Sequence, residues 1–299
     1  MKTKVVVTGG AGFIGSNLVD ELVGRGFEVH VIDNLVAGKK ENVHRDATLH
    51  VKDITRLEEI EPVINGAHYV FHLAALPRVQ YSIEKPIETN EVNVNGTLNV
   101  LVAADRAKVK KVIYSASSSA YGDQTVMPLK ETMPAAPKSP YGLQKYIGEL
   151  LCKAWSEIYN VPTVGLRYFN VYGPRQSAEG SYPLVIALFL KQKKEGKAMT
   201  ITGDGSQTRD FTHVRDVVSA NLLAAESTTV GSGEVINIGA GRNQSIKLIA
   251  ELIGGSVEYI PSRFEPRDTL ADNSLARSLL GWQPKVSIEE GIAELKARG

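Results

Sequence analysis

Short apolar runs of strand length alternate with stretches of helical periodicity through the first half of the chain. Residues 4–7 form the first apolar run, residues 16–23 place apolar side chains at helical spacing, and residues 28–32 form the second run. The alternation continues through further strand-like and helix-like stretches at 49–51, 69–75, 90–108, 111–115, 141–158 and 162–167. Such βαβ alternation predicts an α/β fold with a Rossmann-type, doubly wound parallel sheet.

The pattern loosens after residue 168. Apolar spacing predicts helices at 181–194, 214–225 and 288–296 and a strand at 235–239, whereas residues 200–211 are polar and rich in glycine. We therefore expect residues 1–168 to form the sheet domain, to which segments near 212–240 return. Residues 169–299 should form mainly a smaller, partly discontinuous α/β domain that covers a cleft at the edge of the sheet.

Composition and charge exclude several classes of protein. Hydrophobic residues make up 43% and charged residues 22% of the 299 residues, and the net charge is +1. These values are typical of a soluble globular protein and give no reason to expect a nucleic acid or a membrane surface as a partner. The single cysteine, Cys152, excludes an intrachain disulfide and a cysteine-built metal site, and we expect no metal. Because residues 1–4 lead straight into a strand, a cytoplasmic protein is expected.

A glycine-rich turn joins the first strand to the first helix. Gly9, Gly12 and Gly15 recur at three-residue intervals, and Asp33 ends the second strand. Strand, glycine turn, helix, strand and acid together form the fingerprint of a dinucleotide-binding unit, where glycines allow close approach of a pyrophosphate and the helix N-terminus offers unpaired N–H groups. Asp33 would accept hydrogen bonds from the adenosine ribose. Since no arginine follows it to receive a 2′-phosphate, NAD is favoured over NADP. A turn that serves packing alone is the alternative.

Two polar residues near strand ends allow a structural or a functional interpretation. Asp53 follows the strand at 49–51, where an acid either caps the next helix or contacts the adenine amino group. His72 lies within the fourth predicted strand, and we expect it to be a packed strand residue rather than a ligand.

The candidate chemistry lies at the start of the helix at 141–158. Tyr141 and Lys145 are four residues apart, so they share one helix face. A tyrosine hydroxyl, with a pKa near 10, is a poor base at neutral pH, and lowering its pKa by about three units requires about 4 kcal/mol. The Lys145 ammonium and the positive nicotinamide of NAD⁺ could together supply that. Ser117 lies just past the fifth strand, where open α/β sheets place ligands, and could bind a substrate oxygen held by Tyr141. A surface pair and a serine-rich turn without function are the alternatives.

The glycine turn, the Ser117, Tyr141 and Lys145 set and the Arg-Tyr-Phe-Asn stretch at 167–170 resemble the extended short-chain dehydrogenase/reductase family, in particular its nucleotide-sugar 4-epimerases. The resemblance covers essentially the whole chain. It implies that NAD is held by Gly9, Gly12, Phe13, Ile14, Gly15, Asp33, Asn34, Asp53, Ile54, Ala74, Ala75, Tyr141, Lys145 and Tyr168. It implies that a UDP-sugar contacts Ser117, Ser118, Asn170, Arg209, Arg267, Thr269 and Asp272, and that a homodimer forms through the helices around Asn95 and Gly148.

One stretch departs from the family pattern. The family usually has an Arg-Pro-Gly-acid stretch before the last substrate loop, and the stretch from Arg263 to Arg267 is one residue shorter. The role of Arg263 therefore stays open, while that of Arg267 is less affected.

The residues after Ser117 distinguish among the reactions of the family. Related dehydratases and decarboxylases place an acidic residue just after the catalytic hydroxyl, whereas Ser118 and Ser119 follow here. A bare Ser–Tyr–Lys set predicts transient oxidation at carbon 4 of a UDP-sugar and re-reduction on the opposite face, as in an NAD-dependent 4-epimerase. A UDP-glucuronate 4-epimerase, a nucleotide-sugar dehydratase and a decarboxylase are the alternatives, and a non-catalytic NAD-binding sensor is a remote one.

Thr269 bears on the choice of sugar. In the resembling epimerases, the position before the Leu-Ala-Asp stretch lines the pocket beside the C2 substituent, where a tyrosine admits only a hydroxyl and a small residue admits an N-acetyl group. Thr269 occupies that position. The resemblance therefore implies turnover of UDP-N-acetylglucosamine and UDP-N-acetylgalactosamine along with UDP-glucose and UDP-galactose. If Thr269 faces elsewhere, the loop fits only the smaller sugars.

Overall fold

A seven-stranded parallel sheet forms the centre of the molecule. Its strand order is β11–β6–β5–β4–β1–β2–β3, and every neighbouring pair is parallel. The strands are β1 (Lys4–Thr8), β2 (Glu28–Asp33), β3 (Thr48–Val51), β4 (Tyr69–His72), β5 (Lys111–Ser117), β6 (Thr163–Tyr168) and β11 (Ser232–Ile238). The computed structural model describes residues 2–178, 184–261 and 268–298. The predicted doubly wound parallel sheet is confirmed.

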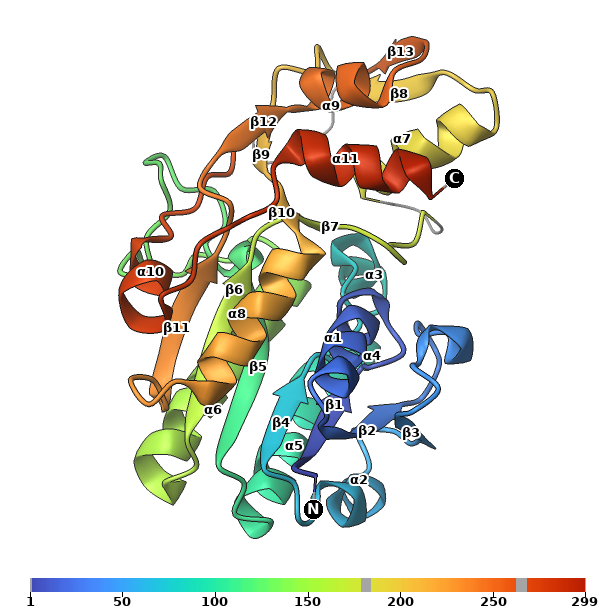
Figure 1. Cartoon of the computed structure of the whole chain (residues 1–299). Coiled ribbons are helices and arrows are strands. Elements are labelled where there is room, and N and C mark those ends of the chain that lie inside the picture. Colours follow the sequence, from blue (N-terminus) through green and yellow to red (C-terminus); the bar gives the residue numbers. More distant parts are fainter. Residues whose placement is uncertain (1, 179–183, 262–267, 299) are drawn as a thin grey trace.

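Helices cover both faces of this sheet. The helices α1 (Phe13–Gly24) and α8 (Val214–Glu226) pack on one face, and α2 (Leu57–Ile64), α5 (Gly96–Arg106) and α6 (Pro140–Tyr159) pack on the other. Figure 1 shows α1 and α8 on the near side of the strands. Along β1, Val5 and Val7 contribute to one core and Val6 to the other. A strand buried on both faces reads as a continuous apolar run, which is why the strand patterns were clear in the sequence.

The helix expected at 90–108 is longer and less regular than predicted. The short helices α3 (Val79–Glu84) and α4 (Pro86–Asn90) come first, and a π-helical stretch at Glu91–Asn95 then leads into α5. π-helical segments of this kind often occur at functional sites. Short 3₁₀ turns occur at Lys40–Asn42, next to the glycine turn, and at Ser118–Ala120, directly after Ser117.

A smaller unit lies beyond the carboxyl ends of the central strands (Figure 1). It contains α7 (Val185–Lys194), α9 (Ile246–Ile253) and α11 (Ile288–Ala297) around a core of its own. Three short strand pairs complete it: β7 (Val171–Tyr172) with β10 (Thr212–His213), β8 (Met199–Thr202) with β13 (Val257–Ile260), and β9 (Thr208–Asp210) with β12 (Asn243–Ser245). The strands β8 and β9 lie in the stretch from 200 to 211 that the sequence pattern left without structure. The helix α10 (Ser274–Leu280) packs beside β11.

The chain returns to the sheet after the first part of the smaller unit. Residues 212–213 form β10, α8 then covers the sheet, and β11 becomes its edge strand next to β6. Of the helices in the described part of the chain, none has the length and apolar character needed to cross a bilayer.

Candidate active site

The glycine turn follows β1 and opens α1. Gly9 has φ +74, and a Cβ there would lie 2.7 Å from the backbone nitrogen of Ala74. A Cβ on Gly15 would overlap the carbonyl oxygen of Gly9, so both positions need glycine for the chain's own packing. Gly12 is different. It is the N-cap of α1, no side chain in the described chain caps the helix there, and a Cβ would meet only the Gly9 oxygen, at 3.2 Å. The open first turn of α1 therefore fits a pyrophosphate.

Asp33 holds the turn from the end of β2. Asp33 is 8% exposed, and its carboxylate accepts hydrogen bonds from the Ala11 N–H at 3.0 Å and the Leu35 N–H at 2.8 Å. Each oxygen accepts one of these bonds, which leaves lone pairs for ribose hydroxyls. Asn34 donates to Asp53 at 3.1 Å, linking the ends of β2 and β3.

Asp53 organises the turn before α2 without capping that helix. Its Oδ1 accepts from the Thr55 N–H at 2.9 Å and the Thr55 hydroxyl at 2.8 Å, whereas the N-cap position of α2 is Arg56. Ile54 beside it is 5% exposed and packs against Gly96 of α5. The expected contacts of Asp53 and Ile54 with adenine stay a prediction.

The end of β4 forms a wall behind the glycine turn. His72 is 1% exposed, shares hydrogen bonds with Thr8 at 2.7 Å and Thr97 at 2.9 Å, and burial lowers its pKa to about 3. The packed role predicted for His72 is confirmed. Ala74 donates its N–H to the Thr8 hydroxyl at 3.2 Å, and Ala75 follows it, half-buried.

Tyr141 lies in the first turn of α6 and meets Ser117 at the end of β5. Ser139 caps α6 by accepting the Gly142 N–H at 3.1 Å, and the Tyr141 N–H donates to Ser82 of α3 at 3.0 Å. Burial raises the pKa of Tyr141, and a hydrogen bond with Ser117 lowers it. Burial alone thus acts against a base, so the phenolate has to be stabilised by hydrogen bonds and nearby positive charge.

Ser117 is itself held by a residue that the sequence argument missed. The Ser119 hydroxyl hydrogen-bonds with the Ser117 hydroxyl, and the Ser119 N–H donates to the same oxygen at 3.2 Å. Ser118 lies between them, half-buried, in the 3₁₀ turn. The run of three serines was the available signal, but its spacing could not show which hydroxyl supports which.

Lys145 is buried one turn further along α6. Its ammonium donates to the Ser115 carbonyl at 2.9 Å and lies 5.0 Å from the ring centre of Tyr114. Tyr114 returns a hydrogen bond to the Lys145 carbonyl at 3.2 Å. Burial lowers the pKa of Lys145 to about 8, so the ammonium form still predominates at neutral pH. The structure therefore brings Ser117, Tyr141 and Lys145 together and adds Ser115 and Tyr114 as supports for the lysine.

The Tyr168 hydroxyl lies on the face of the sheet that α1 and α8 cover, opposite to α6. The hydroxyl accepts from Asn221 of α8 at 2.8 Å and shares a hydrogen bond with Ser115 at 3.1 Å. Its expected place near the nicotinamide stays a prediction.

The predicted substrate residues are assembled from separate segments. Asn170 donates to the Asp210 carbonyl at 3.2 Å and to the Thr269 hydroxyl at 3.1 Å. Thr269 also accepts from the Asp210 N–H at 3.3 Å, so its side chain faces Asn170. Arg209 is half-buried next to this cluster and donates to the Thr208 carbonyl at 2.9 Å. Arg263 and Arg267 lie outside the described residues.

Asp210 joins three of these segments and was not recognised in the sequence. It is fully buried, and its carboxylate accepts from Ala240 at 2.8 Å, Gly241 at 3.0 Å and Ala271 at 2.9 Å. Burial raises the pKa of Asp210 to about 6, and these N–H groups lower it from what burial alone would give. Its partners are distant in sequence, so no local pattern indicates this role.

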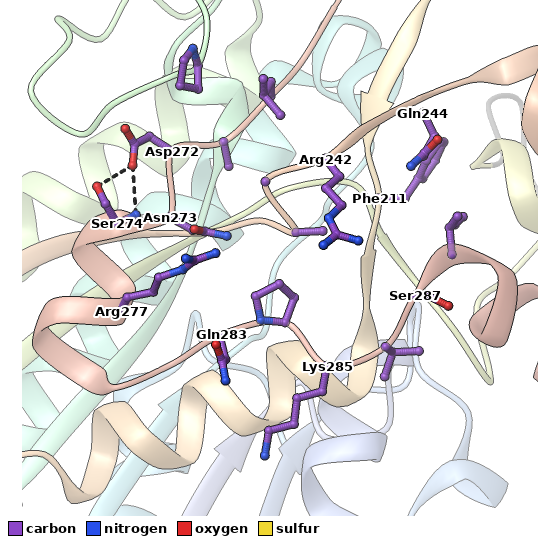
Figure 2. Close-up of a pocket in the computed structure, with 18 of the residues that line it drawn as sticks. Phe211, Arg242, Gln244, Asp272, Asn273, Ser274, Arg277, Gln283, Lys285 and Ser287 are labelled. Atoms are coloured by element: carbon purple, nitrogen blue, oxygen red, sulfur yellow. Dashed lines mark hydrogen bonds between the residues drawn. The ribbon is translucent and has the colours of Figure 1, made fainter.

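Asp272 is engaged with its own neighbourhood. Its carboxylate accepts from the Ser274 N–H at 2.9 Å, at the start of α10, and lies 3.8 Å from the Lys130 ammonium. Figure 2 shows this bond on the wall of a pocket of about 640 Å³ between α10, the β11–β12 loop and the segment leading to α11. Arg242, Arg277 and Lys285 line the same pocket, which does not include Ser117, Tyr141 or Lys145. It is therefore a hollow separate from the candidate catalytic residues.

Comparison with known proteins covers the whole chain. A sequence model described as the NAD dependent epimerase/dehydratase family matches residues 5–239. A UDP-glucose 4-epimerase of Mycolicibacterium smegmatis is 36% identical over 305 residues, covering 97% of this chain and 96% of that protein.

Solved structures agree with this. The structure of a UDP-glucose 4-epimerase of Thermotoga maritima with UDP-glucose superposes with a TM-score of 0.92 at 40% identity, covering 99% of both chains. A UDP-N-acetylglucosamine 4-epimerase of Methanobrevibacter ruminantium, in complex with UDP-N-acetylmuramic acid, gives a TM-score of 0.93 at 37% identity over 100% of both chains. Other matches are UDP-sugar acid decarboxylases, a UDP-glucuronic acid 4-epimerase and an epimerase in complex with NAD. The similarity thus includes both the sheet unit and the smaller unit.

Proposed function

Because the chain belongs to the NAD dependent epimerase/dehydratase family, and within it to the UDP-sugar 4-epimerases with their decarboxylase and glucuronate epimerase relatives, we propose that it interconverts UDP-sugars at carbon 4. Its cofactor is NAD. The reaction is transient oxidation at carbon 4 followed by re-reduction on the opposite face. Residues 1–168, with the segments near 212–240, form the NAD-binding domain in this proposal, and residues 169–299 mainly bind substrate.

The observation that carries the proposal is the turn after β5. Ser117 hydrogen-bonds with Tyr141 and Ser119, and the positions that follow Ser117 are serines rather than acids. The related dehydratases and decarboxylases use an acidic residue just after the catalytic hydroxyl for acid–base work beyond the redox step. A set of hydroxyls with one lysine supports epimerisation.

The chain's own groups account for the proton movement. Tyr141, as the phenolate, accepts the proton of the sugar 4-hydroxyl, and Ser117 holds the same oxygen. The Lys145 ammonium, one helical turn away, stabilises the negative charge on Tyr141. When bound, NAD supplies the acceptor and then the donor of the carbon-4 hydride.

The residues present fit NAD. The open N-terminus of α1 at Gly12, Phe13 and Ile14 suits the pyrophosphate, and the Asp33 carboxylate suits unmodified ribose hydroxyls. A carboxylate at this position repels the 2′-phosphate of NADP.

A homodimer through the helices around Asn95 and Gly148 belongs to the proposal; these are the π-helical stretch that leads into α5, and α6. The support is a set of apolar side chains left exposed on α6 and on α3 and α4, which precede the π-helical stretch: Ile83 at 54%, Ile87 at 86%, Leu143 at 48% and Leu150 at 48%. Gly148 itself faces inward, since a Cβ there would overlap the Tyr114 hydroxyl. It allows α6 to approach β5 rather than touching a partner. A cytoplasmic location is proposed as typical of the family.

We further propose that the enzyme accepts N-acetylated sugars. Thr269 is small, and its hydroxyl is held toward Asn170, a second residue expected in the substrate site. A side chain of this size leaves room beside the C2 position that a tyrosine would fill. A match to a UDP-N-acetylglucosamine 4-epimerase supports the same choice.

A panel of substrates tests the proposal. Purified protein is incubated separately with UDP-glucose, UDP-N-acetylglucosamine and UDP-glucuronate, and the products are separated and identified by NMR. The expected products of the first two are UDP-galactose and UDP-N-acetylgalactosamine. A pentose product or a 4-keto-6-deoxy sugar would instead show decarboxylation or dehydration and overturn the proposal. Turnover of UDP-glucose without UDP-N-acetylglucosamine would overturn only the statement about acetylated sugars.

A further inference from the structure

Arg175 lies on the segment that leaves β7 and crosses from the substrate side to the cofactor side. Its backbone is in the left-handed region, at φ +69, and Gly173 before it is at φ +149. A Cβ on Gly173 would overlap the side chain of Val214 at the start of α8. The turn is therefore constrained on both sides, and it directs the Arg175 side chain toward α1.

The Arg175 guanidinium binds three groups of the sheet unit. It forms an ion pair with the Asp20 carboxylate, donates to the Asn17 amide oxygen at 3.4 Å and donates to the Asn42 carbonyl at 3.0 Å. The side chain is only 27% exposed. Asn17 and Asp20 belong to α1, whereas Asn42 belongs to the loop after β2, so one side chain ties two elements together.

These partners lead directly to the glycine turn. Asn17 donates to the Phe13 carbonyl at 2.9 Å in the first turn of α1, and to the Pro174 carbonyl at 3.1 Å beside Arg175. Asn42 donates to the Ala11 carbonyl at 3.0 Å, within the glycine turn itself. Arg175 thus acts on both sides of the turn, through Asn17 on the helix and through Asn42 on the loop.

We propose that Arg175 is a positioning residue that holds the glycine turn in the shape that NAD requires and thereby slows the release of NAD. The proposal rests on NAD as the cofactor and not on which sugar is turned over. A cofactor that is restored in each cycle has no need to leave, and a turn already held in its binding shape loses less conformational freedom when the ligand binds. The charge-assisted hydrogen bonds of Arg175 supply that restraint from outside the turn.

Arg175→Asn tests this. Asparagine tolerates the left-handed backbone but is too short to reach Asp20 or Asn42. The release of NAD, followed by trapping the free cofactor with a second enzyme, should become about tenfold faster. In NAD-free protein, amide hydrogen exchange of residues 11–17 should also become faster, which is a readout independent of activity. Arg215→Asn is the matched control, because Arg215 forms an ion pair with Glu294 at 2.8 Å that also joins two parts of the molecule but lies away from the glycine turn. It should leave both readouts unchanged.

A second variant keeps the test decisive if Arg175→Asn fails to fold. Asp20→Asn removes the ion pair at a carboxylate that is 41% exposed and leaves the bond to Asn42. NAD release should then rise by a few fold, less than for Arg175→Asn. Release of NAD at the wild-type rate from the folded variants, with unchanged exchange of residues 11–17, would overturn the proposal, even if the melting temperature fell. If wild-type protein turned over no UDP-sugar but still bound NAD, the proposed reaction would fail, and the two NAD readouts would still test the role of Arg175.

Discussion

The proposed cofactor site (the cofactor end) and the proposed substrate site (the substrate end) are built in different ways. Most of the cofactor end comes from one continuous stretch, residues 8–42, in which Asp33 reaches the glycine turn across a single βαβ unit. The substrate end is assembled by Asp210 and Thr269 from segments near 170, 208, 240 and 271. The difference suggests that the two ends can be perturbed separately, with Ser117, Tyr141 and Lys145 at their boundary.

The largest effect is expected at that boundary. Tyr141→Phe removes the proton acceptor and keeps the ring, so turnover should fall by about 10²–10⁴-fold. NAD and UDP-sugar should still bind, since the ring of Tyr141 and the other residues proposed to hold the two ligands are kept. Steady-state turnover and cofactor titration would measure both. Tyr159→Phe, at the exposed end of α6, is the control and should behave as wild type. Near-normal turnover of Tyr141→Phe would show that another group is the base.

A change confined to the substrate end should alter selectivity alone. Thr269→Tyr overpacks the space beside the C2 position and should lower turnover of UDP-N-acetylgalactosamine by about 10–100-fold, while sparing UDP-galactose and NAD affinity. Thr269→Ser keeps the hydroxyl that binds Asn170 and should retain both activities. Equal loss of both sugars in the tyrosine variant would mean that Thr269 supports the loop and does not select the sugar.

Replacing Lys145 should have opposite effects on activity and on stability. Burial lowers its pKa from the ordinary 10.5 to about 8, so charging it opposes folding by about 3 kcal/mol at most, offset in part by its bond to the Ser115 carbonyl. Lys145→Met should therefore abolish turnover and weaken NAD binding, yet raise the unfolding free energy of NAD-free protein at pH 7 by about 1–2 kcal/mol.

The pH dependence of this gain follows from the same pKa. Lys145 keeps its proton up to a higher pH in the unfolded chain than in the folded protein. The unfolding free energy of the wild type should therefore rise between pH 8 and 10.5, and its difference from that of Lys145→Met should shrink. Denaturant unfolding at pH 7 and pH 10 measures it. Lys153→Met on the exposed side of α6 should show neither effect. A destabilised Lys145→Met at pH 7 would show that the hydrogen bond outweighs burial.

The smallest effects are expected from two carboxylates that have the same structural role, one at each end. Asp33→Asn and Asp210→Asn each replace a buried acceptor of backbone N–H groups with an amide that accepts fewer. We expect about tenfold weaker NAD binding for the first and about tenfold higher KM for the UDP-sugar for the second. Calorimetric NAD binding and the KM measure the two. Equal losses in both ligands from either variant would mean that the two ends are not independent.

The sequence predicted features whose cause is local. The parallel sheet, the glycine turn and the Tyr141–Lys145 pair each depend on residues that are close in the chain. That Tyr141 and Lys145 share a helix face follows from their spacing alone. The strands β8 and β9 were not expected, because these segments of four and three residues become strands only by pairing with β13 and β12 much later in the chain.

Support roles could not be predicted for a similar reason. Asp210 and Arg175 act through contacts that the fold creates, and nothing in their immediate neighbours indicates the partner. For Ser119 the run of serines was visible, but not which hydroxyl supports which. The contact of Asp272 with Lys130, which is distant in sequence, was not predictable for the same reason. A resemblance can name residues in a site, but the geometry shows which residues hold them in place.

The most direct test of the central claim follows the hydrogen on carbon 4. UDP-glucose and UDP-N-acetylglucosamine carrying deuterium at carbon 4 are incubated with the protein in water, and the epimers are examined by NMR and mass spectrometry. If carbon 4 is oxidised and re-reduced within one active site, deuterium stays at carbon 4 of the epimer with the configuration inverted. Loss of the label to solvent, or inversion at another carbon, would contradict the account.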